Sequence, residues 1–244
     1  DDVMSAAGVA DFILLCGHGV SDDVLRAARK TKLVQLCSAG FDGVNLELAG
    51  EMGIPVANNG GTNAVPVAEF AITLTLAAIR HLVITDSHTR AGDWMRPELD
   101  GRDSHELFGA TVGIIGAGRI GSTVAGMLRG FETTTLYTDP VRSEKAEEFG
   151  ATRVDLDELL ERSDIVTLHT ALNTSTNGLI GERELKLMKN TAVLVNTCRG
   201  PVIQEPALHS ALVDGEIWGA GIDVFEQEPV DPNNPILKLE NVIV

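Results

Sequence analysis

The chain has 244 residues, of which 44% are hydrophobic and only 4% are aromatic. This composition predicts a globular core filled by aliphatic side chains, as in parallel sheets covered by helices. The formal net charge of −16 repels nucleic acid and anionic membrane surfaces, so we expect neither as a partner. The longest apolar stretch, 67–79, contains Glu69 and is too short to cross a bilayer.

The three cysteines, Cys16, Cys37 and Cys198, form no even disulfide framework. Cys16 and Cys37 lie in apolar runs, so we expect both to be buried thiols in a reducing, cytoplasmic environment. The printed residues show no signal-peptide pattern. They also show no metal-ligand spacing and no nucleophile–base motif, so we expect no metal site.

The first part of the chain alternates short apolar runs with helical patterns, which is the βαβαβ order of a small parallel sheet. Ser21 can cap the first of these helices, and Asp22 and Asp23 favour its positive end. The expected strands are 12–16, 33–37 and 54–57, and the expected helices are 21–30 and 46–52.

A loop of asparagine and glycine, 58–61, separates this part from a long helical pattern. Apolar residues keep near-helical spacing over 67–79, and the sequence predicts one long helix, about 65–90, inside a linking segment, 63–92. A helix of this length can bridge two domains or pack against a partner chain. A polar segment, 92–105, then interrupts the pattern.

A second α/β series begins at Thr111 and continues to the end of the printed sequence. Its repeated alternation of strand and helix predicts a doubly wound parallel sheet of the Rossmann type. The expected strands are 111–115, 133–138, 164–169, 192–197, 219–224 and 241–244.

Three glycines, Gly116, Gly118 and Gly121, join the first strand of this series to the helix that follows it. Gly116 permits a tight turn, Gly118 lets a pyrophosphate approach the backbone, and Gly121 lets the helix pack closely on the strand. Phosphates then lie at the positive end of the helix. Because strand, turn and helix occur in this order, the glycine spacing predicts a dinucleotide-binding unit.

Asp139 ends the next expected strand, 18 residues after Gly121, where a carboxylate can accept hydrogen bonds from the adenosine ribose. The same negative charge would repel the additional phosphate of NADP, at a cost of several kcal/mol. The sequence therefore favours NAD as the cofactor. Arg142 lies close by in the sequence and could offset part of this repulsion, which leaves NADP open.

Six ordered blocks extend the pattern beyond the glycine loop, and together they are far more specific than any one of them. The blocks are SAGFDGVN (38–45), GIPVANNGGTNAVPVAE (53–69), GATVGIIGAGRIG (109–121), DIVTLHTALNTSTNGLI (164–180), LVNTCRG (194–200) and GAGIDVFEQEP (219–229). With these blocks, the chain resembles the D-isomer-specific 2-hydroxyacid dehydrogenases over nearly its whole length. Glu132 stands where that family often has a glycine, a departure that looks like tolerated drift.

The resemblance implies an oxidoreductase that transfers a hydride between NAD(H) and a small 2-hydroxy or 2-oxo acid. Residues 1–62 would be part of a smaller, flavodoxin-like α/β substrate (catalytic) domain, and residues 63–244 would be the NAD-binding Rossmann domain. It also implies an active-site cleft between the two domains and a homodimer.

The family motifs imply the site residues one by one. Arg199 matches the catalytic arginine that binds the substrate carboxylate, and Glu228 matches the acid that pairs with a catalytic histidine. Ser38, Ala39 and Gly40 match the turn whose backbone N–H groups bind the substrate carboxylate. The implied cofactor contacts are Gly116, Gly118, Arg119, Ile120, Gly121, Asp139, Thr197, Cys198, Arg199 and Asp223.

In this family the catalytic histidine follows the strand matched by 241–244, where the sequence ends. We therefore expect the chain to be a piece of a longer protein, truncated at both ends and lacking that histidine. None of its own histidines stands at the catalytic place, and His169, at a strand end, is expected to be structural. The histidines are His18, His81, His88, His105, His169 and His209.

Two rival functions stay open from the sequence. One is an NADP-preferring glyoxylate or hydroxypyruvate reductase, and the other is a non-catalytic, NAD-sensing regulator on the same fold. The loops 38–45 and 58–63 contain no cation, which favours a small unphosphorylated acid as substrate. Arg90, Arg96 or Arg102 could still bind a phosphate, so a phosphorylated acid also stays open.

Overall fold

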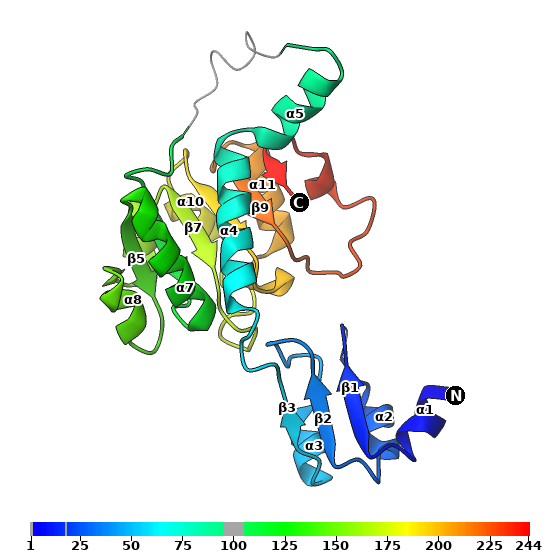
Figure 1. Cartoon of the computed structure of the whole chain (residues 1–244). Helices are drawn as coiled ribbons and strands as arrows, with labels where there is room; N and C mark the ends of the chain where they lie inside the picture. Colours follow the sequence, from blue (N-terminus) through cyan, green and yellow to red (C-terminus); the bar gives the residue numbers. More distant parts are fainter. Residues whose placement is uncertain (1, 18, 95–104) are drawn as a thin grey trace. The chain divides into compact units, whose positions relative to one another are not determined.

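The computed structural model of the chain describes residues 2–17, 19–94 and 105–244 (Figure 1). The chain divides into two compact units, Asp1–Ala64 and Val65–Val244, each with its own parallel sheet. Three residues that the sequence singles out, His18, Arg96 and Arg102, lie outside the described residues.

The first unit is a three-stranded parallel sheet in the order β1-β2-β3. Its core contains Leu25, Val34 and Leu36, which are almost fully buried. Ser21 caps the second helix, because its hydroxyl accepts a hydrogen bond from Val24 N at 3.4 Å. The elements are α1 (Asp2–Ala7), β1 (Phe12–Leu15), α2 (Asp22–Ala27), β2 (Leu33–Leu36), α3 (Leu46–Glu51) and β3 (Val56–Ala57).

Cys16 and Cys37 are exposed, so the expectation that they are buried thiols is wrong. Side chains alternate between the faces of a strand, and Cys16 therefore shares a face with Phe12 and Leu14. These two side chains are 67% and 65% exposed. The apolar run around Cys16 thus forms a strand, but this face of it is not part of the core.

The second unit contains a seven-stranded sheet in the order β10-β9-β8-β7-β4-β5-β6, and every neighbouring pair is parallel. The doubly wound Rossmann sheet predicted from the sequence is confirmed. The short edge strand β6 was not expected, because its two exposed residues show no apolar pattern. The strands are β4 (Thr111–Ile115), β5 (Thr134–Thr138), β6 (Thr152–Arg153), β7 (Ile165–Leu168), β8 (Val193–Asn196), β9 (Gly219–Ile222) and β10 (Val242–Ile243).

Helices cover both faces of this sheet, and each face has its own hydrophobic cluster. One cluster packs α4, α7 and α8 against residues such as Val112 and Ile114, and the other packs α9, α10 and α11 against Val166 and Leu168. The helices are α4 (Ala64–Ile79), α5 (Leu82–Arg90), α7 (Arg119–Leu128), α8 (Glu144–Glu148), α9 (Leu156–Arg162), α10 (Glu182–Leu187) and α11 (Glu205–Val213), with short 3-10 turns at Arg129–Phe131, Gly200–Val202 and Pro235–Lys238.

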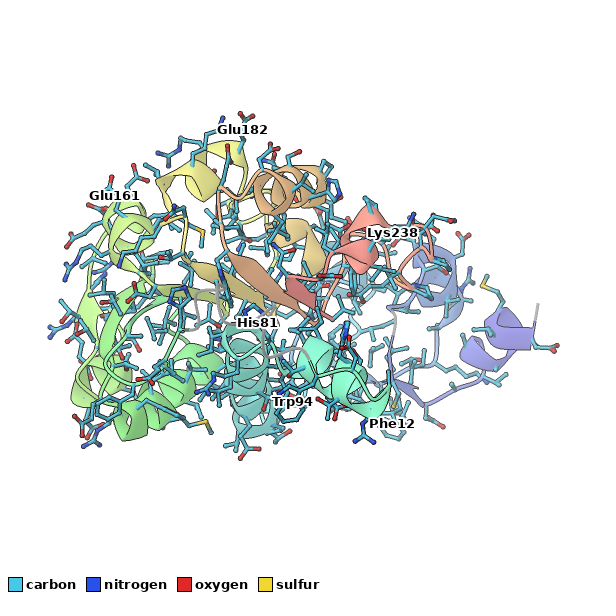
Figure 2. All side chains as sticks on the ribbon, turned by 90° about the horizontal axis from the view of Figure 1, so that it is seen from above. Phe12, His81, Trp94, Glu161, Glu182 and Lys238 are labelled. Carbon is cyan, nitrogen blue, oxygen red and sulfur yellow. The ribbon has the colours of Figure 1, made fainter. Side chains whose placement is uncertain are left out.

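The outer sides of the helices are acidic, in line with the net charge. Glu161 on α9 and Glu182 on α10 are exposed and project away from the sheet (Figure 2). Apolar side chains therefore point inwards from these helices, and the charge lies on the surface.

The single long helix expected over 65–90 is instead two helices, α4 and α5, bent by 63°. The break comes at His81, whose φ of 51° is left-handed and cannot continue a helix. The sequence does not reveal this break because apolar residues resume directly after it, at Leu82. Across the described ranges, no single helix has the length and hydropathy to cross a membrane, and the bent pair meets that test only jointly, by length and composition.

Glu132 ends the first 3-10 turn with a φ of 53°, again in the left-handed region. Glycine adopts this conformation without steric cost, whereas other residues lose about 1–2 kcal/mol. This backbone conformation therefore favours glycine at position 132.

Candidate functional site

The strand order of the second unit reverses between β4 and β7. In register, Ile115 at the end of β4 pairs with Thr138 of β5 and with Leu168 of β7. Gly116, Asp139 and His169 follow directly after these strands and emerge at one edge of the sheet. Ligands of open parallel sheets bind at such a reversal, outside the carboxyl ends of the strands.

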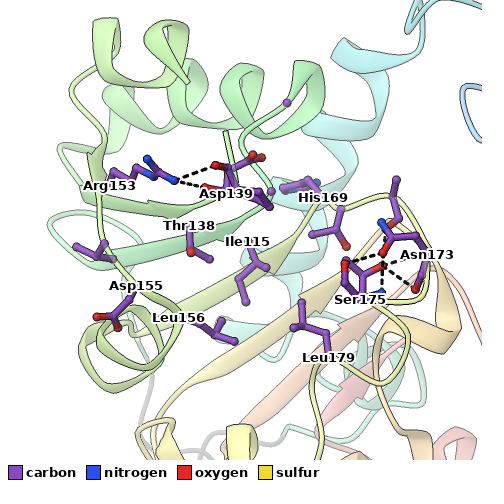
Figure 3. Close-up of a pocket in the computed structure, with 17 residues that line it drawn as sticks. Ile115, Thr138, Asp139, Arg153, Asp155, Leu156, His169, Asn173, Ser175 and Leu179 are labelled. Atoms are coloured by element: carbon purple, nitrogen blue, oxygen red, sulfur yellow. Dashed lines mark hydrogen bonds between the residues drawn. The ribbon is translucent and has the colours of Figure 1, made fainter. Parts of the chain in front are cut away.

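A cavity of about 950 Å³ lies at this edge (Figure 3). Its wall includes Gly116, Gly118 and Asp139, three residues implicated by the sequence. The rest of the wall comes from the ends of β4 and β5, the segment 153–156 and the loop after β7. The lining residues are Ile115, Gly116, Gly118, Thr138, Asp139, Pro140, Arg153, Val154, Asp155, Leu156, His169, Thr170, Ala171, Asn173, Ser175, Thr176 and Leu179.

The glycine loop is tight at two points. Gly116 has a φ of 91°, and a Cβ there would lie 2.8 Å from the carbonyl carbon of His169. A Cβ on Gly121 would lie 2.1 Å from the backbone oxygen of Gly116. Only glycine fits at either position. The loop leads into α7, whose N-cap residue, Gly118, lines the cavity. No side chain caps the helix there.

Asp139 ties the end of β5 to the glycine loop. One carboxylate oxygen accepts a hydrogen bond from Ala117 N at 2.8 Å, and the other accepts one from Val141 N at 2.8 Å. Ser143 adds a second tie, since its hydroxyl donates to the backbone oxygen of Ala117 at 2.6 Å. A carboxylate has about four acceptor positions, so Asp139 can still accept from a ligand hydroxyl.

Two arginines near Asp139, Arg142 and Arg153, both donate hydrogen bonds within the protein. Arg142 donates to Glu147 through Nε at 2.9 Å and Nη2 at 2.6 Å, which lowers the pKa of Glu147. Tyr137 also donates to Glu147, at 2.9 Å. Arg153 donates through Nη2 to the backbone oxygens of Asp139 at 2.7 Å and Pro140 at 3.1 Å (Figure 3). Of these two arginines, Arg153 lines the cavity and Arg142 does not.

His169 lies in the cavity wall next to Gly116. Burial lowers the pKa of His169 to about 3, so its imidazole is neutral at physiological pH. Nε2 lies 3.0 Å from Thr167 Oγ1, and the buried Nδ1 has no hydrogen-bond partner among the described residues. A neutral buried imidazole is a poor proton donor, so His169 is suited to orienting groups and not to acid catalysis.

The loop after β7 also lines the cavity, and sequence analysis assigned none of its residues to the site. Its shape depends on Asn173, whose Oδ1 accepts from the backbone N of Ser175 at 2.8 Å and from its hydroxyl at 2.7 Å. Thr176 donates to the backbone oxygen of Ala171 at 2.6 Å. One signal could have identified this loop: it follows the strand that the predicted topology places beside the glycine strand.

A second group of implicated residues lies at the end of β8, outside the cavity wall. Asn196 orders this loop, since its Oδ1 accepts from Cys198 N at 3.0 Å and its Nδ2 donates to Arg199 O at 2.9 Å. Thr197 and Cys198 are buried, and burial raises the pKa of the Cys198 thiol. The buried Oγ1 of Thr197 has no hydrogen-bond partner in the described part of the chain.

Asp223 and Glu228 follow β9, the next strand. Asp223 N donates to Asn196 O at 3.0 Å, and Phe225 N donates to Glu228 Oε1 at 3.1 Å. A Cβ on Gly200 would lie 1.9 Å from the carbonyl carbon of Phe225, so the loops after β8 and β9 pack backbone to backbone. The pKa of Asp223 is raised, chiefly by burial and then by the negative charge of Glu228. The loop containing Arg199 therefore adjoins the turn containing both carboxylates.

Comparison with known proteins agrees with this geometry. Residues 72–244 match the family model described as "D-isomer specific 2-hydroxyacid dehydrogenase, NAD binding domain". The chain belongs to this family. The resemblance noted from the six sequence blocks is thereby confirmed, as is the class of oxidoreductase that it implied.

The alignments with individual relatives cover nearly the whole of this chain. It is 43% identical over 237 residues to a glyoxylate reductase of Korarchaeum cryptofilum, covering 96% of this chain and 71% of that protein. It is 39% identical over 225 residues to a D-3-phosphoglycerate dehydrogenase of Archaeoglobus fulgidus, covering 92% and 42%. A D-lactate dehydrogenase structure with NAD⁺ from Lactobacillus jensenii matches with a TM-score of 0.80 and 29% identity, covering 100% of this chain and 77% of that one.

The remaining residues that the resemblance implies as cofactor contacts lie on α7. Arg119 is the first residue of that helix and is exposed, whereas Ile120 is partly buried against the hydrophobic cluster below the helix. Together with Gly121, they lie outside the lining of the cavity.

Within the described part of the chain, no group of His, Cys, Asp or Glu side chains is arranged to hold a metal ion.

The turn expected to bind the substrate lies in the first unit and is braced by the loop after β3. Ser38 Oγ donates to Gly40 O at 2.8 Å, within the turn itself. From the loop, Asn58 Nδ2 donates to Ala39 O at 2.7 Å, and Asn59 N donates to Ser38 O at 3.1 Å. Sequence analysis placed the turn but not the two asparagines that fix it.

The low pKa of His169 predicts a pH dependence of stability. Its pKa rises from about 3 in the folded chain to 6.5 in the unfolded one, so the unfolded state binds the additional proton between these values. Stability should therefore fall as the pH is lowered from 6.5 towards 3, by up to about 1.4 kcal/mol per pH unit from this group. Urea unfolding of the cofactor-free protein at several pH values measures the slope.

In that experiment, His169→Gln should flatten the dependence below pH 6.5. His209→Gln on α11 is the matched control and should keep the wild-type slope. Equal slopes for the wild type and His169→Gln would show that burial of His169 does not couple to stability in this way.

Proposed function

We propose that this chain binds NAD(H) in the cavity at the ends of β4, β5 and β7, and that the protein interconverts a small 2-hydroxy acid and the corresponding 2-oxo acid. The observation that most supports the proposal is the glycine loop, where Gly116 and Gly121 leave no room for a Cβ. The loop presents an uncapped helix N-terminus to the cavity, which suits a pyrophosphate. The unpartnered, buried Nδ1 of His169 fits a ligand in the same cavity.

Asp139 supports NAD over NADP. In the proposal, its carboxylate accepts hydrogen bonds from the two ribose hydroxyls at the adenosine end, and it repels an additional phosphate there. Arg142 cannot offset that repulsion without leaving Glu147, to which it is bound through two nitrogens. Arg153 is the arginine that lines the cavity, and its Nη2 already binds two backbone oxygens.

Arg199 is proposed as the catalytic cation. Bound NAD(H) would supply the hydride transfer that interconverts the 2-hydroxy acid and the 2-oxo acid. Negative charge then develops on the carbonyl oxygen of the oxo acid, and a fixed guanidinium stabilises it. The same planar group can bind the substrate carboxylate through two hydrogen bonds. Asn196 supports this role, because it holds the backbone of Arg199 at the end of β8.

Glu228 and Asp223 are proposed to act through other groups. Glu228 would hold a histidine in its protonated form, since a nearby carboxylate favours imidazolium. Such a proton donor contributes about 10²–10⁴-fold to the rate. Asp223, at the end of the neighbouring strand, would orient the carboxamide of the nicotinamide. Thr197 and Cys198 would form the adjoining wall.

The proposed substrate is a small unphosphorylated acid, bound at its carboxylate by the backbone of the turn Ser38–Gly40. Several relatives are named glyoxylate reductases, among them the proteins of Korarchaeum cryptofilum and Aeropyrum pernix, which fits this size. The relative from Archaeoglobus fulgidus is named for phosphoglycerate. Assay of the full-length protein on a panel of both kinds of 2-oxo acid would decide between them.

Three further proposals concern the whole protein. The first unit is proposed to be part of a flavodoxin-like substrate domain, as the family resemblance implies, and its three strands form a parallel sheet. The protein is proposed to be a homodimer, as the family resemblance implies, and to act in the cytoplasm. A non-catalytic NAD-sensing role is the alternative, and a panel of 2-oxo acids without any turnover would support it.

We predict that NADH binds at least tenfold more tightly than NADPH, which corresponds to about 1.4 kcal/mol. Asp139→Asn should narrow this ratio, because it removes the charge while keeping the side-chain shape. Asp214→Asn, at the end of α11, makes the same change in net charge away from the cavity and should leave the ratio unchanged. Titration of cofactor fluorescence measures both constants, and equal affinities in the wild type would refute the role of Asp139.

We also predict that Arg199→Ala in the full-length protein lowers kcat/KM for the best oxo acid by about 10²–10³-fold, as for loss of an oxyanion donor. NADH affinity should stay within a few-fold of the wild type. Arg199→Lys should recover part of the rate, since it restores the charge but not the planar fork. Arg183→Ala, on the surface of α10, is the control. Near-normal turnover of Arg199→Ala would remove this residue from the mechanism.

A further inference from the structure

Cys16 and Cys37 follow directly after neighbouring strands of the first unit. Leu15 of β1 pairs in register with Leu36 of β2, and Cys37 N donates to Leu15 O at 2.9 Å, which continues the ladder past the strand ends. Adjacent strands lie about 4.8 Å apart. A disulfide requires Cα atoms about 4.4–6.8 Å apart, so the backbone brings the two cysteines within bridging distance.

The two thiols also lie on the same face of the sheet. Residues paired in register on parallel strands point to the same side, and here that side also contains Phe12 and Leu14. Both cysteines are exposed, whereas Cys198 is buried in the other unit. The pKa of Cys37 is raised, chiefly by a hydrogen bond with the Cys16 side chain, then by burial and by the charge of Cys16. The two side chains are therefore accessible and lie on the same face of neighbouring strands.

We propose that Cys16 and Cys37 form a redox-active dithiol, which a low-molecular-weight organic disulfide converts into an intramolecular disulfide. The Cys16 thiolate attacks one sulfur of the organic disulfide, forms a mixed disulfide and releases one thiol. Cys37 then loses its proton and attacks the protein-bound sulfur, which forms the Cys16–Cys37 bond and releases the second thiol. The protein dithiol is oxidised by two electrons, and the organic disulfide is reduced to two thiols.

The position of the pair connects it to the proposed substrate turn, so this part of the inference rests on the proposed function. Cys37 directly precedes Ser38, and its backbone oxygen accepts a hydrogen bond from Asn59 Nδ2 at 2.9 Å. A bond from Cys37 to Cys16 joins the start of the turn to the end of β1. It should therefore alter binding of the oxo acid without altering cofactor binding, because the cofactor cavity belongs entirely to the second unit.

Oxidised glutathione is the probe for the test. The protein is treated with it, denatured and alkylated, and its mass is measured. The proposal predicts that the treated protein takes up one alkyl group where the reduced protein takes up three, and that digestion gives a cross-linked peptide that joins Cys16 to Cys37. Dithiothreitol should restore all three thiols. Stable glutathione adducts on either cysteine, with no cross-linked peptide, would overturn the proposal.

Matched variants locate the bond. Cys198→Ser should still form the cross-link, whereas Cys16→Ser and Cys37→Ser should each stop at the glutathione adduct. These readouts need no turnover, so they are independent of the proposed enzyme activity. In the full-length protein, oxidation should raise KM for the oxo acid while NADH affinity stays unchanged. The double variant Cys16→Ser/Cys37→Ser should not respond. A cross-link that forms without any change in KM would refute the link to the substrate turn.

Discussion

The structure depends on two close backbone contacts of the glycine loop after β4, one within the loop and one with the segment that follows β7. Gly121 can approach the backbone oxygen of Gly116 only because it has no Cβ, and Gly116 can lie against the backbone of His169 for the same reason. These two contacts fix where α7 begins. The register of β4 with β5 and β7 then brings Asp139 and His169 to the same edge. The cavity is a consequence of that alignment.

Local positive groups must attract the proposed ligands, because the net charge of the chain is negative. The net charge is −16, yet the proposed ligands are anions. Their attraction must come from groups placed at the strand ends, such as the start of α7 and the guanidinium of Arg199. Near the cavity, Arg142 is neutralised by Glu147, whereas Arg153 donates to the backbone oxygens of Asp139 and Pro140. This arrangement leaves Asp139 to select against an additional phosphate.

The sequence predicted correctly those parts of the fold that depend on a local residue pattern. The strands β4, β7 and β8 are mostly apolar and almost entirely buried, and Gly116, Gly118 and Gly121 occupy the positions that their spacing predicts. Predictions failed where long-range packing decides. The break at His81 interrupts an apolar pattern that continues on both sides of it. The exposure of Cys16 depends on which face of β1 is covered, and a run of apolar residues does not show that.

The most direct measurement is a crystal structure of the chain with NADH. The pyrophosphate should lie at the start of α7, within hydrogen-bond distance of backbone N–H groups of the loop Gly116–Gly121. The adenosine ribose should donate to the carboxylate of Asp139. A cofactor bound elsewhere, or with its adenosine ribose turned away from Asp139, would contradict the proposed role of the glycine loop and Asp139 in cofactor binding.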